Sequence, residues 1–274
     1  MQMPFSKLNG LGNSFILMND LNGAVSGDLD VSRLAQRVCD VAFGVGADGL
    51  ILVQEATTHD YRMSIINSDG SEAEMCGNGI RCMARFLNEE NISAKQALTI
   101  ETLAGPIGIE QKERGLVEVD MGKPVFVNRD VVSDAAGDLL TLDVCGYPFT
   151  YVSMGNPHAV TFVDSFEFEW KKVGADVETT TAVFPNRTNV EFGQVENRRE
   201  LTMKVWERGC GETMACGTGT CALVVAGVHT GRVDEGDVRV HLPGGDLSIR
   251  YFRGGHVWMT GPAVTVCRGV YEYE

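Results

Sequence analysis

Two stretches of the chain read Glu72-Ala-Glu-Met-Cys76-Gly-Asn-Gly79 and Glu212-Thr-Met-Ala-Cys216-Gly-Thr-Gly219. Each has a Glu four residues before a Cys, followed by Gly-x-Gly and a run that predicts a helix. The start of a helix offers N–H groups without partners and a partial positive charge, so it stabilises a thiolate and attracts a carboxylate. Two such positions indicate a reaction that uses a pair of thiols.

Other landmarks repeat at the same offset of about 140 residues. A Pro-Phe strand leads into a Gly-Asn turn at 4–13 and again at 148–156, and a segment that begins with Phe opens an apolar strand at 43–53 and again at 184–192. The agreement in order and spacing indicates that the chain is two copies of one unit. We therefore expect a pseudo-twofold molecule whose active site lies in the cleft between two domains.

Within each copy the pattern is mixed α/β, with mixed or antiparallel strands around a central helix. Short β-branched runs predict strands at 98–102, 117–119, 160–163, 201–206 and 238–242. The segment 31–40 predicts an amphipathic helix, and 220–228 is apolar on nearly all sides, so it should be a buried helix. In the helix after Cys76, Arg81 and Arg85 should lie outside the apolar stripe. The stretch 128–143 has no counterpart and suggests a surface linker or insertion.

The composition narrows the class of protein. The chain has 274 residues, 44% of them apolar, which favours two domains. A formal net charge of −14 argues against nucleic acid and anionic membrane as partners and favours a small molecule. The absence of an apolar run of about 20 residues and of a signal-peptide core predicts a cytoplasmic protein.

Eight cysteines occur, which we expect to be reduced in that compartment. Five of them should be buried and unreactive, namely Cys39, Cys82, Cys145, Cys221 and Cys267. The sequence has no Cys-x-x-Cys and no His-x-x-x-His, so no metal is expected. A structural disulfide between Cys76 and Cys216 is the alternative to a catalytic pair, and a thiol redox or metal-binding protein is the alternative function.

A thiolate and a thiol on opposite faces of one bound molecule would form an acid/base pair that inverts a carbon centre. One group removes a proton and the other delivers a proton to the opposite face, while the helix starts hold the neighbouring carboxylate. We expect no cofactor, because the sequence contains neither a Walker motif nor a dinucleotide fingerprint.

Further polar residues recur at matched places in the two copies. Asn13 and Asn156 both follow glycines, Asn67 and Glu207 both lie nine residues before their Cys, and Asn189 stands opposite a glycine. Asn and Gly are common in turns for backbone reasons alone. The matched placement favours a role in substrate binding.

Two more residues lie beside these positions. Arg208 next to Glu207 places a cation and an anion side by side, which suits a zwitterionic amino-acid group or an ordinary surface ion pair. His158 either tunes a thiol or bonds to a local carbonyl.

The motifs together resemble the diaminopimelate epimerase family along essentially the full chain. They are Gly10-Leu-Gly-Asn13, Asn67-Ser-Asp-Gly-Ser-Glu72, Cys76-Gly-Asn-Gly79, Met154-Gly-Asn-Pro-His158, Glu207-Arg-Gly-Cys-Gly-Glu212, Ala215-Cys-Gly-Thr-Gly219 and Leu242-Pro-Gly-Gly245. The resemblance implies cofactor-independent interconversion of LL- and meso-2,6-diaminopimelate, on the route to lysine and peptidoglycan, with Cys76 and Cys216 as the two bases. It implies His158 and Glu207 as residues that adjust thiol acidity. The implied substrate contacts are Asn13, Asn67, Gly77, Asn78, Asn156, Asn189, Glu207, Arg208, Gly217 and Thr218.

The resemblance also implies domain boundaries and an assembly. The N-terminal domain would comprise 1–117 plus 263–274, the C-terminal domain 118–262, and the protein would be a homodimer. Two positions depart from some relatives, which have Gln where Gly49 stands and Tyr where Cys267 stands. Cys-Gly-x-Gly alone would also suit a proline racemase-like enzyme, which is the alternative reading of the same fold.

Overall fold

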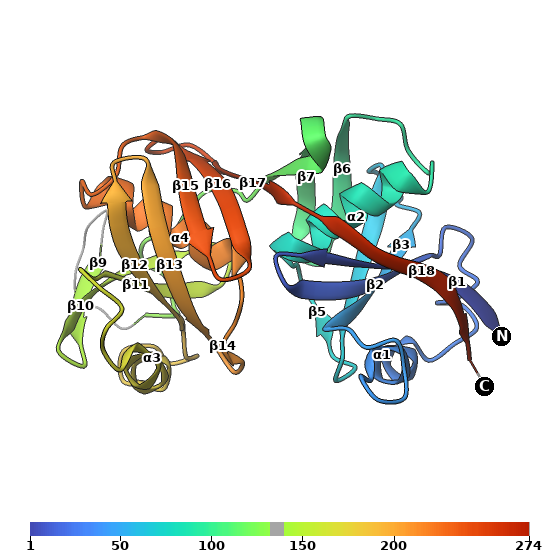
Figure 1. Cartoon of the computed structure of the whole chain (residues 1–274), viewed down its shortest axis with the longest axis horizontal. Helices are drawn as coiled ribbons and strands as arrows, with labels where there is room; N and C mark the ends of the chain where they lie inside the picture. The colour runs from blue at the N-terminus through green and yellow to red at the C-terminus, as the bar shows by residue number, and fades with distance from the viewer. Residues whose placement is uncertain (132–139, 274) are drawn as a thin grey trace. The chain divides into compact units, whose positions relative to one another are not determined.

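The computed structural model describes residues 1–131 and 140–273 (Figure 1). It divides into two compact units, Met1–Val119 with Gly261–Glu274, and Asp120–Thr260. The suggested insertion at 128–143 lies partly outside the described residues. Its last part forms β9 (Leu140–Val144), which pairs with β10 (Tyr147–Ser153), so residues 140–144 belong to a sheet.

The first unit wraps strands around one helix. Its strands are β1 (Gln2–Gly10), β2 (Asn13–Asn19), β3 (Gly49–Gln54), β4 (Tyr61–Asn67), β5 (Glu72–Ala73), β6 (Ala97–Thr102), β7 (Gly105–Gln111), β8 (Leu116–Asp120) and β18 (Val264–Glu272), with a short 3-10 turn η1 (Glu113–Gly115). They pair in the order β18-β1-β2-β3-β4-β6-β7-β8, with β5 beside β4. Two of these pairings, β2–β3 and β4–β6, are parallel and the others are antiparallel.

The second unit repeats this topology. Its remaining strands are β11 (Pro157–Phe162), β12 (Asn189–Asn197), β13 (Glu200–Glu207), β14 (Gly211–Glu212), β15 (Gly236–Leu242), β16 (Gly245–Tyr251) and β17 (Val257–Pro262). They pair in the order β9-β10-β11-β12-β13-β15-β16-β17, and β11–β12 and β13–β15 are parallel. The C-terminal strand β18 lies beside β1 as β9 lies beside β10. The predicted α/β fold of two pseudo-symmetric halves is confirmed.

Each unit has one central helix and one outer helix. The central helices are α2 (Gly77–Glu89) and α4 (Gly217–His229), and the outer ones are α1 (Val31–Cys39) and α3 (Trp170–Glu178). Helix α2 contacts β1, β2, β3, β4 and β7, and α4 contacts β10, β11, β12 and β16, so strands surround both. No helix in the described part of the chain is long and apolar enough to span a bilayer.

The two central helices are both buried, but their buried side chains differ in polarity. Helix α4 is apolar on nearly all sides and buried almost throughout, as predicted. The prediction for α2 was wrong at Arg81, whose side chain is fully buried, whereas Arg85 is partly exposed. Arg81 is accommodated because its guanidinium donates to three acceptors, as described below. The position matched to Arg81 by the repeat is Cys221, which is also fully buried.

The cysteine predictions were correct in part. Cys39, Cys82 and Cys221 are buried, and burial raises the pKa of the first two to about 12, which makes them poor nucleophiles. Cys145 and Cys267 are exposed, so the prediction was wrong for them. Cys145 lies in the tight β9–β10 turn with φ 55°, and Cys267 lies on β18 opposite Lys7 of β1.

Candidate active site

Cys76 is the N-cap residue of the central helix in the first unit. Its Sγ accepts the backbone N–H of Gly79 at 3.4 Å, so the sulfur occupies the place of an ordinary capping oxygen. A Cβ at Gly79 would lie 3.1 Å from Cδ1 of Ile51 and 3.2 Å from Cδ1 of Ile65. Glycine at this position therefore lets the helix start pack closely against the sheet, and Cys76 itself is half-buried.

Asn13 presents its carbonyl oxygen to Cys76. The thiol donates to Asn13 Oδ1 at 3.7 Å, and Nδ2 of Asn78 donates to the same oxygen at 3.4 Å. The amide of Asn13 is oriented by Asp48, whose Oδ2 accepts from Asn13 Nδ2 at 3.0 Å and from the backbone N–H of Ser14 at 2.6 Å. Because a carboxylate accepts hydrogen bonds, the Asn13 nitrogen faces Asp48 and its oxygen faces the thiol.

Arg81 supports this helix start from inside the unit. Its guanidinium donates to Gly77 O at 2.9 Å, to Asn78 Oδ1 at 2.8 Å and to Pro262 O at 3.2 Å. The bond to Oδ1 turns the amide nitrogen of Asn78 toward Asn13. The buried cation thus orients a predicted substrate contact and joins the helix to the returning C-terminal segment.

The predicted residue Asn67 lies on β4, and Gly49, which departs from some relatives, lies on β3. Asn67 is exposed at the end of β4, and its Nδ2 donates to Ser71 Oγ at 3.0 Å. Gly49 pairs with Asn67 across β3 and β4. A Cβ at Gly49 would lie 2.9 Å from Ile66 O, so a side chain at this position requires a shift of the backbone.

Cys216 is the N-cap residue of α4 but is more enclosed than Cys76, with 5% of its surface exposed. Burial raises the pKa of the Cys216 thiol well above its ordinary value, and the carboxyl groups of Glu207 and Glu191 raise it further. The Thr218 hydroxyl, 3.6 Å from Sγ, and the Gly219 N–H lower the pKa.

Asn156 connects Thr218 to His158 through hydrogen bonds. Nδ2 of Asn156 donates to Thr218 Oγ1 at 3.3 Å, and Asn156 Oδ1 lies 3.0 Å from Nε2 of His158. Nδ1 of His158 lies 2.7 Å from Oε1 of Glu191, and both of these side chains are fully buried. The matched residues Asn13 and Asn156 thus point opposite ends of their amides toward the helix starts.

Glu207 is the last residue of β13, Arg208 begins the turn that follows, and Asn189 is the first residue of the neighbouring strand β12. Glu207 accepts a hydrogen bond from the Thr213 hydroxyl. Asn189 is buried, and its Oδ1 accepts the Arg208 N–H at 3.0 Å while its Nδ2 donates to Pro157 O at 2.9 Å. The exposed Arg208 side chain donates to Asn186 O at 3.1 Å. Asn189 therefore links the loop that carries Arg208 to the strand that carries His158.

Three side chains that organise these sites are not indicated by the sequence motifs: Asp48, Arg81 and Glu191. Glu191 lies between Val190 and Phe192, which are both buried, and such a charged residue inside an apolar strand is a usable signal. The roles of Asp48 and Arg81 depend on contacts with distant residues, which local patterns do not report.

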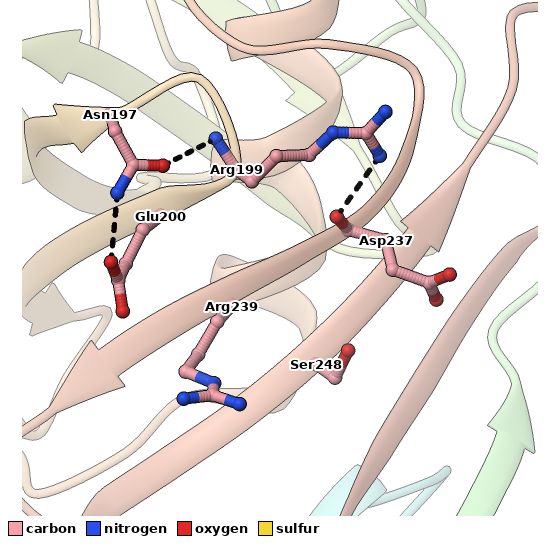
Figure 2. A pocket seen from close by; sticks show the side chains of 6 residues that line it. All are labelled: Asn197, Arg199, Glu200, Asp237, Arg239 and Ser248. Atoms are coloured by element: carbon pink, nitrogen blue, oxygen red, sulfur yellow. Dashed lines mark hydrogen bonds between the residues drawn. The ribbon is translucent and has the colours of Figure 1, made fainter.

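A separate hollow of about 310 Å³ lies on the second unit and is lined by Asn197, Arg199, Glu200, Asp237, Arg239 and Ser248 (Figure 2). Asn197 bonds to Glu200 and to the backbone of Arg199, whose guanidinium donates to Asp237 O. Its lining mixes both charges and includes neither Cys76 nor Cys216.

Solved structures with the same fold span the whole chain. A phenazine biosynthesis protein of the PhzF family from Bacillus anthracis superposes with a TM-score of 0.72 at 17% identity, covering 100% of both chains. A hydroxyproline epimerase from Agrobacterium vitis superposes with a TM-score of 0.67 at 17% identity, covering 98% of this chain and 91% of the other. The duplicated fold of this chain is therefore the fold of the structural class that includes these proteins.

Sequence comparison identifies the family. The profile described as diaminopimelate epimerase matches residues 5–127 and 150–266. Diaminopimelate epimerases from Desulfitobacterium hafniense and Moorella thermoacetica are 48% and 49% identical, covering 98% of this chain and 98% of the first relative, and 99% of this chain and 100% of the second. The chain belongs to the diaminopimelate epimerase family.

Proposed function

We propose that the protein is an isomerase that interconverts LL- and meso-2,6-diaminopimelate in lysine biosynthesis, with Cys76 and Cys216 as its acid and base. The observation that carries the proposal is the cysteine at the N-cap of the central helix in both units. Family membership supplies the substrate. The proline racemase-like alternative is not favoured, because the hydroxyproline epimerase is 17% identical whereas the diaminopimelate epimerases reach 49%.

The reaction requires one thiol group on each face of the α-carbon. A thiolate removes the α-proton, and the electron pair left on carbon delocalises onto the adjacent carboxylate. The other thiol then delivers its proton to the opposite face, so the two sulfurs exchange protonation states in each turnover. Gly77, Asn78, Gly217 and Thr218 begin the two helices, whose N–H groups stabilise the carboxylate charge. These steps need no cofactor.

The polar residues around each thiol supply the binding groups in this proposal. Asn13, Asn67, Asn156 and Asn189 offer amide donors and acceptors, and Glu207 with Arg208 suits the charged ammonium and carboxylate groups. His158 and Glu207 adjust the acidity of Cys216. The exposed position of Asn67 and the partial exposure of Asn13 support their access to a ligand.

Turnover in deuterium oxide tests the reaction. When LL-diaminopimelate is converted, one deuterium per product molecule should appear at the inverted α-carbon, because the delivering thiol exchanges its proton with solvent. Mass spectrometry and chiral chromatography measure label and configuration together. Proline and hydroxyproline serve as controls and should stay unlabelled. Absence of label from diaminopimelate, or turnover of proline in its place, would contradict the proposal.

We further propose a cytoplasmic homodimer whose domains are the two units, with boundaries near 117 and 262. Strand β18 carries the exposed side chains of Val264, Val266 and Val270, and this apolar surface suits a second copy of the chain. Light scattering should give twice the mass of the chain. Val266→Lys should shift the mass toward the monomer, whereas Val195→Lys, at an exposed valine of β12, should not. A monomeric wild-type protein would refute this assembly.

A further inference from the structure

Glu191 is a fully buried carboxyl group beside the catalytic helix start. Its neighbours Val190 and Phe192 belong to an apolar cluster on the other face of β12, so Glu191 points toward α4. A Cβ at Gly219 would lie 2.5 Å from Glu191 Oε1 and 3.2 Å from Cys216 Sγ. Glycine at position 219 therefore leaves room for both groups at the first turn of α4.

A continuous series of polar contacts runs from Glu191 to Cys216. It passes from Oε1 to His158 Nδ1 at 2.7 Å, from Nε2 to Asn156 Oδ1 at 3.0 Å, from Asn156 Nδ2 to Thr218 Oγ1 at 3.3 Å, and from Oγ1 to Cys216 Sγ at 3.6 Å. If Nε2 carries a proton, it donates to Asn156 Oδ1, and Asn156 then donates to Thr218. The Thr218 hydroxyl keeps its hydrogen for the sulfur.

The hydrogen bonds from His158 to Thr218 reverse their direction when Nε2 lacks a proton. The amide of Asn156 would then turn its nitrogen toward Nε2 and its oxygen toward Thr218, whose hydrogen would leave the sulfur. The proton on Nε2 thus decides whether Cys216 receives a hydrogen bond.

Glu191 keeps that proton in place. A protonated Glu191 donates to Nδ1, which leaves the neutral ring protonated at Nε2. If the proton moves across the 2.7 Å contact, the ring carries protons on both nitrogens. Both arrangements therefore have hydrogen on Nε2, and only loss of a proton from the pair removes it.

We propose that Glu191 is a positioning residue for Cys216: it holds a proton on Nε2 of His158 and thereby directs Asn156 and Thr218 to donate a hydrogen bond to the sulfur. This inference rests on the proposed function, in which Cys216 must become a thiolate. The hydrogen bond from Thr218 to the sulfur offsets the effect of burial, which otherwise disfavours the thiolate.

The surroundings favour a protonated Glu191. Its Oε2 has no hydrogen-bond partner within the described residues, and burial raises the pKa of this carboxyl group. The titratable groups that face Cys216 are Glu207 on β13, Glu191 on β12 and, behind them, His158 on β11. A neutral Glu191 adds no repulsion to the thiolate, whereas an ionised one would oppose it.

Alkylation of Cys216 by iodoacetamide at pH 8.5, followed by mass spectrometry of the Cys216 peptide, reads the thiolate without requiring turnover. Glu191→Met keeps the length of the side chain but cannot donate to Nδ1. It should slow alkylation about 10- to 100-fold, because one hydrogen bond to a charged acceptor shifts the pKa of a thiol by about one to two units. Glu191→Gln, which still donates to Nδ1, should stay within about twofold of wild type. Glu196→Met, at the exposed end of the same strand, is the matched control.

A double-mutant cycle tests whether Glu191 acts on Cys216 through Thr218. Thr218→Val removes the last donor, so adding Glu191→Met to it should cause no further slowing. Faster alkylation in both Glu191 variants would show that Glu191 acts as a charge and would overturn the proposal. Unchanged alkylation in Glu191→Met, or equal slowing in Glu191→Gln, would overturn it as well. The deuterium experiment tests the proposed function separately.

The protonation of His158 can be measured in the wild-type protein, so the proposal remains testable if Glu191→Met fails to fold. Ring ¹⁵N NMR of the histidines, with His158 assigned by its absence from His158→Gln, should show Nε2 of His158 protonated at pH 7. An unprotonated Nε2 would overturn the proposal without any Glu191 variant.

Discussion

Cys216→Ala and Cys76→Ala should each lower kcat/KM for epimerisation by about 10⁴-fold, the upper end of what a positioned proton-transfer group contributes. Inversion needs a proton removed from one face and delivered to the other. The N-cap residue of each central helix is the cysteine itself, so alanine at that position removes the titratable group. Chiral chromatography of the product in both directions measures the loss.

Each alanine variant should keep one partial reaction. The remaining thiol can still remove and return a proton on its own face, so solvent deuterium should enter one stereoisomer without inversion. The two variants should label different stereoisomers, which assigns each thiol to a face. Cys145→Ala, at an exposed thiol on the β9–β10 turn, should keep full activity. Wild-type inversion in either Cys76→Ala or Cys216→Ala would refute the two-base mechanism.

Arg81→Met should cost about 3–5 kcal/mol of the free energy of unfolding, the range expected when one member of a buried charged network is removed. Methionine fills much of the volume but removes the guanidinium that donates to Gly77 O, Asn78 Oδ1 and Pro262 O. Urea unfolding followed by circular dichroism measures the change. KM should rise as well, because Asn78 loses the contact that turns its amide toward Asn13.

Arg85→Met is the matched control one turn further along α2. Its guanidinium is partly exposed and pairs with Glu89 four residues on, at 2.5 Å. A pair of this kind contributes about 1 kcal/mol or less. Equal losses for the two variants would show that burial of Arg81 has no special energetic role.

Sequence patterns predicted most of the secondary structure and the duplication. Strand runs such as 201–206 and 238–242 alternate or are β-branched over their whole length, and they form β13 and β15. The repeat predicted that Cys76 and Cys216 occupy equivalent helix starts, and both are N-cap residues. Local signals sufficed here because capping and strand formation depend on near neighbours.

The same patterns failed where distant residues decide the outcome. Arg81 was expected on the solvent side of its helix, yet the returning C-terminal segment covers it and Pro262 O accepts one of its hydrogen bonds. Cys145 and Cys267 were expected to be buried, yet one lies in a turn and the other on β18.

The Cys-Gly-x-Gly repeats by themselves determined that the protein has two equivalent helix starts, each with a cysteine beside it. Only the tertiary structure decided how the surroundings of the two thiols differ. Asp48 turns the oxygen of Asn13 toward Cys76, while His158 and Glu191 lie behind Asn156, whose nitrogen faces Thr218. Tertiary packing brings these residues together across separations of 33 to 63 positions, and hydrogen-bond polarity depends on which partners meet.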